Sequence, residues 1–205
     1  MSETPSTANE EYANRLVRLG EAPWKRVLHV QAPWQAHVRS LKLGKTLDVG
    51  CGIGRNMISL DPSSVGVDHN PHSIETARQA GLTAYTTDEF FASKELTAPG
   101  TYDSMLVAHV IEHLTPQEAI DIIGSYLPMI KPGGKVVWIT PQEAGFKSDA
   151  THVTFADFDS EAALAKHFGL TPVKHYSFPF PRFVGKFFTY NESVVISLVP
   201  TSSGA

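Results

Sequence analysis

A glycine-rich loop constrains the fold of this chain more than any other feature of its sequence. Residues 46–56 read TLDVGCGIGRN, in which three glycines have the spacing Gly-x-Gly-x-Gly. Glycines let a backbone approach a ligand more closely than side chains would allow. The apolar residues before the loop predict a β-strand, and the residues after it predict the start of a helix. An α/β fold with a ligand beside this loop is therefore expected.

An acidic residue, Asp48, lies two positions before the first glycine and limits which ligands the loop can bind. Loops that bind dinucleotides offer backbone amides and a helix N-terminus to a pyrophosphate. A carboxylate at this position would repel a pyrophosphate and would attract a cationic ligand. Asp48, Gly50, Gly52 and Gly54 are therefore candidate contacts for a ligand that carries positive charge.

The rest of the chain alternates short apolar runs with helical patterns, which is the order of an α/β protein. Residues 65–68 form the second apolar run, and its last residue, Asp68, can accept hydrogen bonds from both hydroxyls of a ribose. Further strands are expected at 82–85, 102–109, 135–140, 171–177 and 193–199, and helices at 10–19, 33–41, 71–80, 116–127 and 160–168. Residues 178–190 are rich in aromatic side chains, and we interpret them as a packed edge rather than as a wall of the substrate site.

Composition excludes several classes of protein. The 205 residues are 42% hydrophobic, enough for one domain with a substantial core. The net charge of −4 lacks the basic excess of a nonspecific nucleic-acid binder. The single cysteine, Cys51, excludes an internal disulfide. Because the sequence shows neither a membrane-spanning run nor a signal-peptide pattern, we expect a cytoplasmic protein without a membrane partner. The net charge argues against a nucleic-acid partner. A homodimer is compatible with the sequence.

Three further motifs complete a recognisable set. Asp88 follows the third apolar run, a Glu-His-Leu segment occupies 112–114, and a Lys-Pro-Gly-Gly segment occupies 131–134. Together with the glycine loop and Asp68, they resemble the class I S-adenosylmethionine-dependent methyltransferases over roughly residues 45–200. Another nucleotide-binding α/β protein, such as a dehydrogenase, is the alternative.

The resemblance implies a Rossmann-like α/β fold in a single methyltransferase domain over residues 1–205. A seven-stranded, mostly parallel sheet with an antiparallel final strand would have helices on both faces. Residues 1–43 would form a helical cap and residues 44–200 the core. Ligands of such sheets lie at the carboxyl ends of the strands.

The resemblance also implies S-adenosylmethionine as the cofactor. Its methionine end would lie beside Asp48 and the first glycines, its ribose beside Asp68, and its adenine beside Asp88. The cofactor-binding residues expected in this way are Asp48, Gly50, Gly52, Gly54, Asp68, His69, Asp88, Glu89, Phe90 and Ala108.

A cluster of histidines and one acid is the second informative motif. On one helical turn, His109, Glu112 and His113 would lie at positions i, i+3 and i+4 on one side. Imidazoles and a carboxylate on one face can hold a divalent metal. His152, in the segment after the fifth strand, is a fourth candidate. Many class I methyltransferases carry Glu-His-Leu without a metal, so a metal-free site with His113 or His152 as a general base is the alternative.

The metal hypothesis has support from a second resemblance. The chain is similar to the metal-dependent 2′-O-methyltransferases that modify the 3′ end of small RNAs, and Glu112, His113 and His152 match their metal ligands. His109 stands where that family has glutamate. This likeness implies Mg²⁺ or Mn²⁺. O-methyltransferases of quinone biosynthesis share a related Glu-His site, so the metal motif does not by itself indicate RNA.

A metal would be most useful for a hydroxyl acceptor, because a hydroxyl is barely ionised at neutral pH. Saccharides or similar diols are therefore the expected acceptors, as in bacterial sugar O-methyltransferases such as those of mycobacterial methylmannose polysaccharide synthesis. Alternatives are a quinol or other small metabolite, an RNA 3′ end, and, in a different class, a noncatalytic S-adenosylmethionine-binding protein. Aromatic rings that could stack on a sugar are Trp24, Trp34, Phe146, Phe178 and Phe180.

Overall fold

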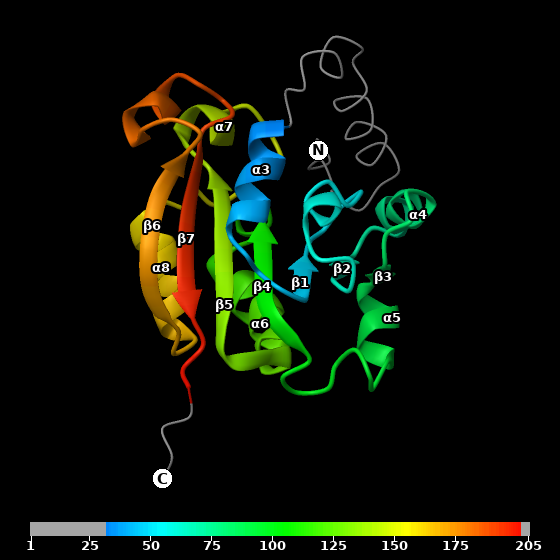
Figure 1. Cartoon of the computed structure of the whole chain (residues 1–205). Helices are drawn as coiled ribbons and strands as arrows, with labels where there is room; N and C mark the ends of the chain where they lie inside the picture. Colours follow the sequence, from blue (N-terminus) through cyan, green and yellow to red (C-terminus); the bar gives the residue numbers. More distant parts are fainter. Residues whose placement is uncertain (1–31, 202–205) are drawn as a thin grey trace, which may run out of the picture.

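A computed structural model describes residues 32–201 (Figure 1). The strands are β1 (Thr46–Val49), β2 (Val65–Asp68), β3 (Ala84–Thr86), β4 (Tyr102–Ala108), β5 (Ile130–Pro141), β6 (Thr171–Phe178) and β7 (Glu192–Leu198). The α-helices are α3 (Ala32–Ser40), α4 (Pro71–Gln79), α5 (Thr87–Ala92), α6 (Pro116–Tyr126), α7 (Glu143–Lys147) and α8 (Phe158–His167). Short 3-10 helices are η1 (Met57–Ser59), η2 (Ile111–His113), η3 (Leu127–Met129) and η4 (Arg182–Lys186).

The seven strands form one sheet in the order β3-β2-β1-β4-β5-β7-β6. The first five strands of the chain pair in parallel, whereas β7 runs antiparallel to both of its neighbours, β5 and β6. The predicted α/β fold with a mostly parallel, seven-stranded sheet is confirmed.

Alternating residues of the central strands build two apolar layers, one on each face of the sheet. In β4, Met105 and Val107 belong to one buried cluster, and Leu106 and Ala108 to the other. The first cluster includes Ile123 of α6 and residues of α8, while the second includes residues that follow α3. Figure 1 accordingly shows α3 in front of the sheet and α6 and α8 behind it. Burial on both faces explains why these strands are nearly continuous apolar runs.

The glycine loop follows β1 as predicted, but the expected helix after it is reduced to the three residues of η1. The backbone N–H groups of Gly50 and Cys51 both donate to the carbonyl oxygen of Val67, at 2.8 and 3.1 Å, which turns the chain sharply. A helix cannot continue because Pro62 follows and the Asp61 carboxylate accepts the backbone N–H of Ser63 in a tight turn.

Other boundaries differ by a few residues. β5 begins at Ile130 rather than at 135, because the Lys-Pro-Gly-Gly segment also lies in the strand, beside a register shift between β4 and β5. α8 begins at Phe158, two residues early, because Asp157 caps it. The helix predicted at 10–19 and most of the predicted cap lie outside the described residues. Within residues 32–201, no helix combines the length and apolar character needed to cross a membrane.

Candidate active site

The carboxyl ends of β1, β2 and β4 bring most of the predicted cofactor residues to one edge of the sheet. β1 lies between β2 and β4, and Val49 is in register with Val67 on one side and Val107 on the other. Asp68 and Ala108, the last residues of β2 and β4, therefore flank the glycine loop. This edge is where open α/β sheets bind their ligands.

The carboxylate of Asp68 is held by the backbone on both sides. One oxygen accepts the N–H of Gly52 at 2.9 Å, and the other accepts the N–H of Asn70 at 2.8 Å. The ring of the neighbouring His69 is exposed, and its Nδ1 lies 3.4 Å from the Asp68 carboxylate. Each carboxylate oxygen has a second lone pair, so Asp68 can still accept hydrogen bonds from a ligand.

Asp48 is buried beside this carboxylate. Burial, reinforced by the charge of Asp68, raises the pKa of Asp48 to about 8. Its Oδ2 atom is buried without a hydrogen-bond partner among the described residues. A cationic ligand would compensate both features, because it would stabilise the ionised carboxylate.

Three consecutive residues predicted to bind the cofactor, Asp88, Glu89 and Phe90, differ in their surroundings. Glu89 and Thr86 form a capping box at the start of α5, and Arg78 donates to the same Glu89 carboxylate at 2.6 Å. Phe90 is fully buried in the core. The side chains of Glu89 and Phe90 thus stabilise the fold, while Asp88 is exposed in the first turn of α5.

His109 follows β4 in a left-handed backbone conformation, with φ at 58°. Its Nδ1 lies 3.1 Å from Glu112 and its Nε2 lies 3.0 Å from Glu192, the first residue of β7. Burial lowers the pKa of His109, but hydrogen bonds to Glu112 and Glu192 outweigh this effect and raise the pKa well above 6.5. An imidazole that donates from both nitrogens is protonated, and a protonated imidazole cannot bind a metal.

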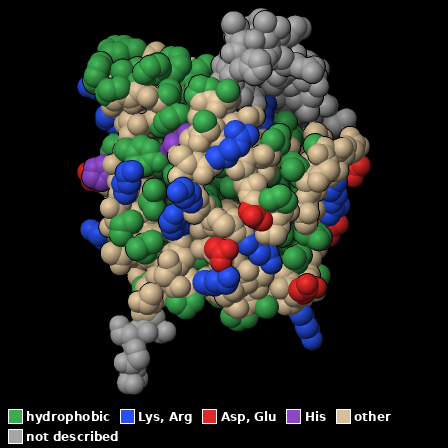
Figure 2. Space-filling view, viewed as in Figure 1, with side chains coloured by type: hydrophobic (Ala, Val, Ile, Leu, Met, Phe, Trp, Pro, Cys, Tyr) green, Lys and Arg blue, Asp and Glu red, His purple; other side chains and the backbone are tan. Residues whose placement is uncertain are grey.

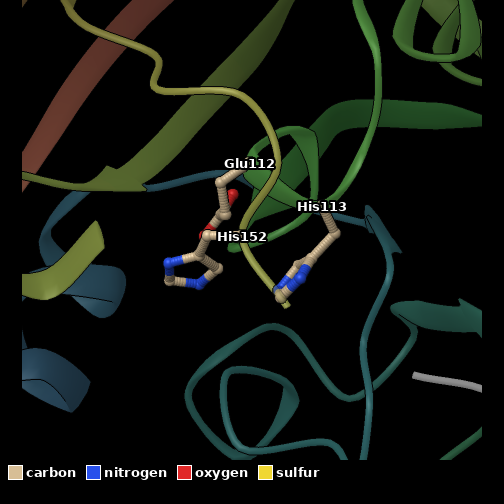
Figure 3. A group of neighbouring side chains, drawn as sticks. All are labelled: Glu112, His113 and His152. Carbon is tan, nitrogen blue, oxygen red and sulfur yellow. The ribbon is translucent and has the colours of Figure 1, made fainter. Parts of the chain in front are cut away.

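Glu112, His113 and His152 converge on one another (Figure 3). One ligand atom from each of the three lies within 4.8 Å of the others. Glu112 is fully buried, and its Oε2 has no hydrogen-bond partner among the described residues. The structure places His109, the fourth predicted ligand, outside this group, because its two nitrogens face carboxylates.

Backbone carbonyls orient both imidazoles of the group. His113 Nδ1 lies 3.2 Å from the carbonyl of Thr151, and His152 Nδ1 lies 2.8 Å from the carbonyl of Phe146. Because a carbonyl only accepts hydrogen bonds, each Nδ1 carries a proton, and in the neutral form of either ring the lone pair lies on Nε2. Histidines that bind metals are oriented in this way.

Burial favours the neutral form of His113, and the ring of Phe146 covers one face of the His152 ring. Burial and the neighbouring His152 lower the pKa of His113, although Glu112 opposes them. The ring of Phe146 stacks on the His152 ring with a centroid distance of 5.3 Å. A neutral imidazole can bind a metal or accept a proton at neutral pH.

The loop that carries His152 is tied to the turn that carries Glu112 and His113. The backbone N–H groups of Val153 and Thr154 both donate to the carbonyl of Glu112, at 2.7 and 3.1 Å. The Thr154 hydroxyl donates to the carbonyl of Leu114 at 2.6 Å. These hydrogen bonds, and the one between His109 and Glu192, were not predicted from the sequence. No sequence motif indicates which backbone groups will pair, or that the first residue of a strand will bind a distant histidine.

Comparison with known proteins shows which family this chain belongs to. A methyltransferase domain model matches residues 15–182, most of the chain. The chain belongs to this family. It is an enzyme, and the family and fold support the expected S-adenosylmethionine-dependent methyltransferase. No protein in a curated set matches the sequence of this methyltransferase.

Several solved structures share the fold. A SAM-dependent methyltransferase from Archaeoglobus fulgidus is 18% identical with a TM-score of 0.63, and the match covers 80% of this chain and 92% of that one. The N-methyltransferase NodS from Bradyrhizobium japonicum, in complex with S-adenosylhomocysteine, is 20% identical with a TM-score of 0.63, covering 93% and 97%. Magnesium protoporphyrin IX methyltransferase from Synechocystis, with the same molecule bound, is 15% identical with a TM-score of 0.67, covering 94% and 96%.

Proposed function

We propose that this methyltransferase transfers the methyl group of S-adenosylmethionine to a hydroxyl of a saccharide or a similar diol-like acceptor. A divalent metal would be held by Glu112, His113 and His152. The observation that carries the proposal is the convergence of these three ligand atoms within 4.8 Å, with both imidazoles oriented by carbonyls.

The donor set fits a metal in two further respects. Glu112 has a buried oxygen without a hydrogen-bond partner among the described residues, which a cation would satisfy. The lowered pKa of His113 keeps its imidazole neutral, as metal binding requires. Two imidazoles and one carboxylate suit Mn²⁺ better than Mg²⁺, which prefers oxygen ligands, so we expect Mn²⁺ to support the higher activity.

Each side of the site would have its own task. Asp48 and Asp68 would bind the positively charged methionine end and the ribose of the donor, together with the glycine loop, His69, Asp88 and Ala108. His113 and His152 would orient the acceptor, and the Phe146 ring would exclude water beside His152. A bound divalent ion supplies Lewis acidity, which lowers the pKa of a hydroxyl that is otherwise a weak nucleophile.

The test is a methyl-transfer assay across saccharides, quinols, amines and RNA 3′ ends, with and without EDTA. The proposal expects turnover of a saccharide or diol that EDTA abolishes and that Mn²⁺ or Mg²⁺ restores, while calorimetry shows unchanged binding of S-adenosylhomocysteine. Full activity in EDTA would reject the metal. Turnover of an amine acceptor alone would reject O-methylation.

A metal-free mechanism is a second candidate, favoured by the lowered pKa of His113. A neutral His113 can accept the proton of a quinol or another acidic hydroxyl without assistance, since such a hydroxyl ionises more easily than that of a sugar. In this case turnover would persist in EDTA but would be lost on the substitution His113→Ala.

A further inference from the structure

A group of aromatic side chains near the site is exposed although the residue types favour burial. Residues 180–190, called here the aromatic tip, include Phe183 and Phe187 with exposed fractions of 66% and 83%. Phe180 and Tyr190, at the two ends of the tip, are also about half exposed. Phenylalanine is among the residues most often found inside proteins, so a cluster of exposed rings indicates an interaction surface.

Hydrogen bonds and close packing hold the backbone of the tip in place. Asn191, which is fully buried, accepts the backbone N–H of Phe180 at 2.9 Å and donates to the buried Gln142 at 2.9 Å. The Arg182 guanidinium makes two hydrogen bonds to Glu143, at 2.7 and 2.9 Å. The backbone of Gly185 lies so close to Gln142 that an added Cβ would be 1.8 Å from its side-chain oxygen. The exposed rings are therefore held outward by a rigid base.

The tip adjoins the candidate active site. Gln142 directly follows β5, and η4 packs against α7. Phe146, on α7, stacks on the ring of His152. In Figure 1, η4 and α7 lie together at the end of the sheet to which β5 points. A surface that the tip touches would thus lie on the same side of the molecule as the acceptor site.

Basic side chains accompany the rings. Lys186 lies within the tip, and Lys147 ends the neighbouring α7; both are exposed. Figure 2 shows hydrophobic side chains gathered over the end of the molecule where η4 lies, with basic side chains along its margin. We propose that the aromatic tip docks this methyltransferase on an anionic lipid surface.

The aromatic rings and the basic side chains of the tip favour an anionic lipid surface over a second copy of the chain. Aromatic rings enter the boundary between headgroups and acyl chains, and each lysine near an anionic surface adds to the attraction. The chain as a whole has a net charge of −4, so attraction to an anionic surface requires a local basic group such as the one at the tip. A stable dimer interface buries about 800 Å² per partner, more than a few protruding rings provide.

If the proposed function also holds, the acceptor would be an amphiphile, with its hydroxyl at Glu112, His113 and His152 and its apolar part toward the lipid. The docking itself depends on neither the metal nor methyl transfer. It can therefore be tested without an acceptor, and its failure would leave the proposed reaction untouched.

The experiment is vesicle flotation of the full chain, using phosphatidylcholine alone and phosphatidylcholine mixed with phosphatidylglycerol. We expect binding to the mixed vesicles that weakens as salt is added. The double variant Phe183→Ser/Phe187→Ser should reduce the partition coefficient roughly tenfold to a hundredfold, and Lys186→Gln roughly fivefold. The control Val173→Ser, at an exposed apolar residue of β6, should bind like the parent protein.

Companion measurements identify other occupants of the tip. Thermal denaturation should give the same Tm for the double variant and the parent, because exposed rings contribute little to folding. A lowered Tm without vesicle binding would mean that the chain's own residues cover the tip and would overturn the proposal. A parent dimer that becomes a monomer in the double variant, again without vesicle binding, would overturn it in favour of self-association. Equal vesicle binding by the parent and the double variant would also overturn it.

Discussion

The two sides of the candidate site are built in different ways. On the proposed donor side, formed by β1, β2, β3 and the loops after them, backbone groups close in sequence hold the candidate side chains; Gly52 and Asp68 are 16 residues apart. On the proposed acceptor side, formed by η2, α7, the aromatic tip and the loop before α8, contacts join distant segments. His113 and Thr151 are 38 residues apart, and His109 and Glu192 are 83 residues apart.

This difference suggests that cofactor binding and catalysis can be changed independently of each other. The donor side depends on short loops whose geometry the sheet fixes, so changes there should affect cofactor binding and local stability. The acceptor side depends on side chains that loops bring together, so changes there should alter catalysis while the sheet stays intact. The predictions on His152, Asp68 and Thr86 test this separation, and that on Glu161 tests a buried carboxyl group of α8; they begin with the largest expected effect.

Replacing His152 should separate catalysis from cofactor binding most clearly. His152→Ala is expected to lower turnover about 10²–10⁴-fold, because it removes an imidazole of the proposed site. Binding of S-adenosylhomocysteine, measured by calorimetry, should be unchanged. His175→Ala, at an exposed histidine of β6 whose ring contacts Phe158, is the matched control. A parallel loss of cofactor affinity in His152→Ala would show that the two sides are not independent.

The buried carboxyl group of Glu161 should make stability depend on pH. Burial raises its pKa to about 8, against the hydrogen bond from Thr140. In the unfolded chain the pKa lies near 4.5, so the folded state binds the extra proton. The stabilisation is complete below the unfolded pKa and is lost as pH rises to about 8.

Glu161→Gln should therefore flatten this dependence. At alkaline pH the variant should be more stable than the parent by on the order of 3 kcal/mol, with a much smaller difference near the unfolded pKa. Urea unfolding across this pH range measures the effect. Asp159→Asn, at an exposed acid of the same helix, should follow the parent curve. An unchanged slope in Glu161→Gln would mean that Glu161 is ionised in the folded protein.

Removing Asp68 should weaken cofactor binding without abolishing folding. Asp68→Ala deprives the ribose of a charged acceptor, at a cost of about 1.5–3 kcal/mol in binding free energy. Calorimetry with S-adenosylhomocysteine gives the value directly. Asp61→Ala, at an exposed turn, controls for the loss of negative charge. Equal affinities for the Asp68 variant and the parent would remove Asp68 from the cofactor site.

The smallest effect should come from the cap of α5 on the donor side. Thr86→Ala removes the hydroxyl that accepts the N–H of Glu89 and should cost about 1 kcal/mol of unfolding free energy. Thr83→Ala, at an exposed position just before β3, should cost less. Denaturant unfolding compares the two. A loss of turnover larger than the loss of stability would indicate that α5 also positions the cofactor.

The donor side was predicted well because local sequence determines it. The bounds of β2 matched at both ends, and the helix expected at 71–80 is present as α4, which ends one residue earlier. Alternating burial and capping residues act over a few positions, so a sequence pattern records them directly. One prediction from the glycine loop was wrong. The sequence predicted a helix after the loop, but the turn at Asp61 and Pro62 ends it after the three residues of η1.

The acceptor side was predicted only in part because side chains distant in sequence determine it. The sequence brought Glu112, His113 and His152 together through a family resemblance, and the structure places them within reach of one another. It did not indicate that Glu192 would engage His109, since nothing local links the two. Nor did it reveal the exposure of Phe183 and Phe187: the absence of long apolar runs argued against a membrane partner, but that criterion detects spans and not exposed rings.

The position of β7 between β5 and β6 has a consequence for synthesis. A ribosome releases the chain in order, so β6 emerges before β7, the strand that separates it from β5 in the finished sheet. Until β7 follows, the hydrogen-bonding groups of β6 lack a partner strand, and such strands invite aggregation. Pro172 and Lys174 lie within β6, and both residue types hinder unwanted strand pairing. They would protect this strand in the nascent chain as well as at the edge of the mature sheet.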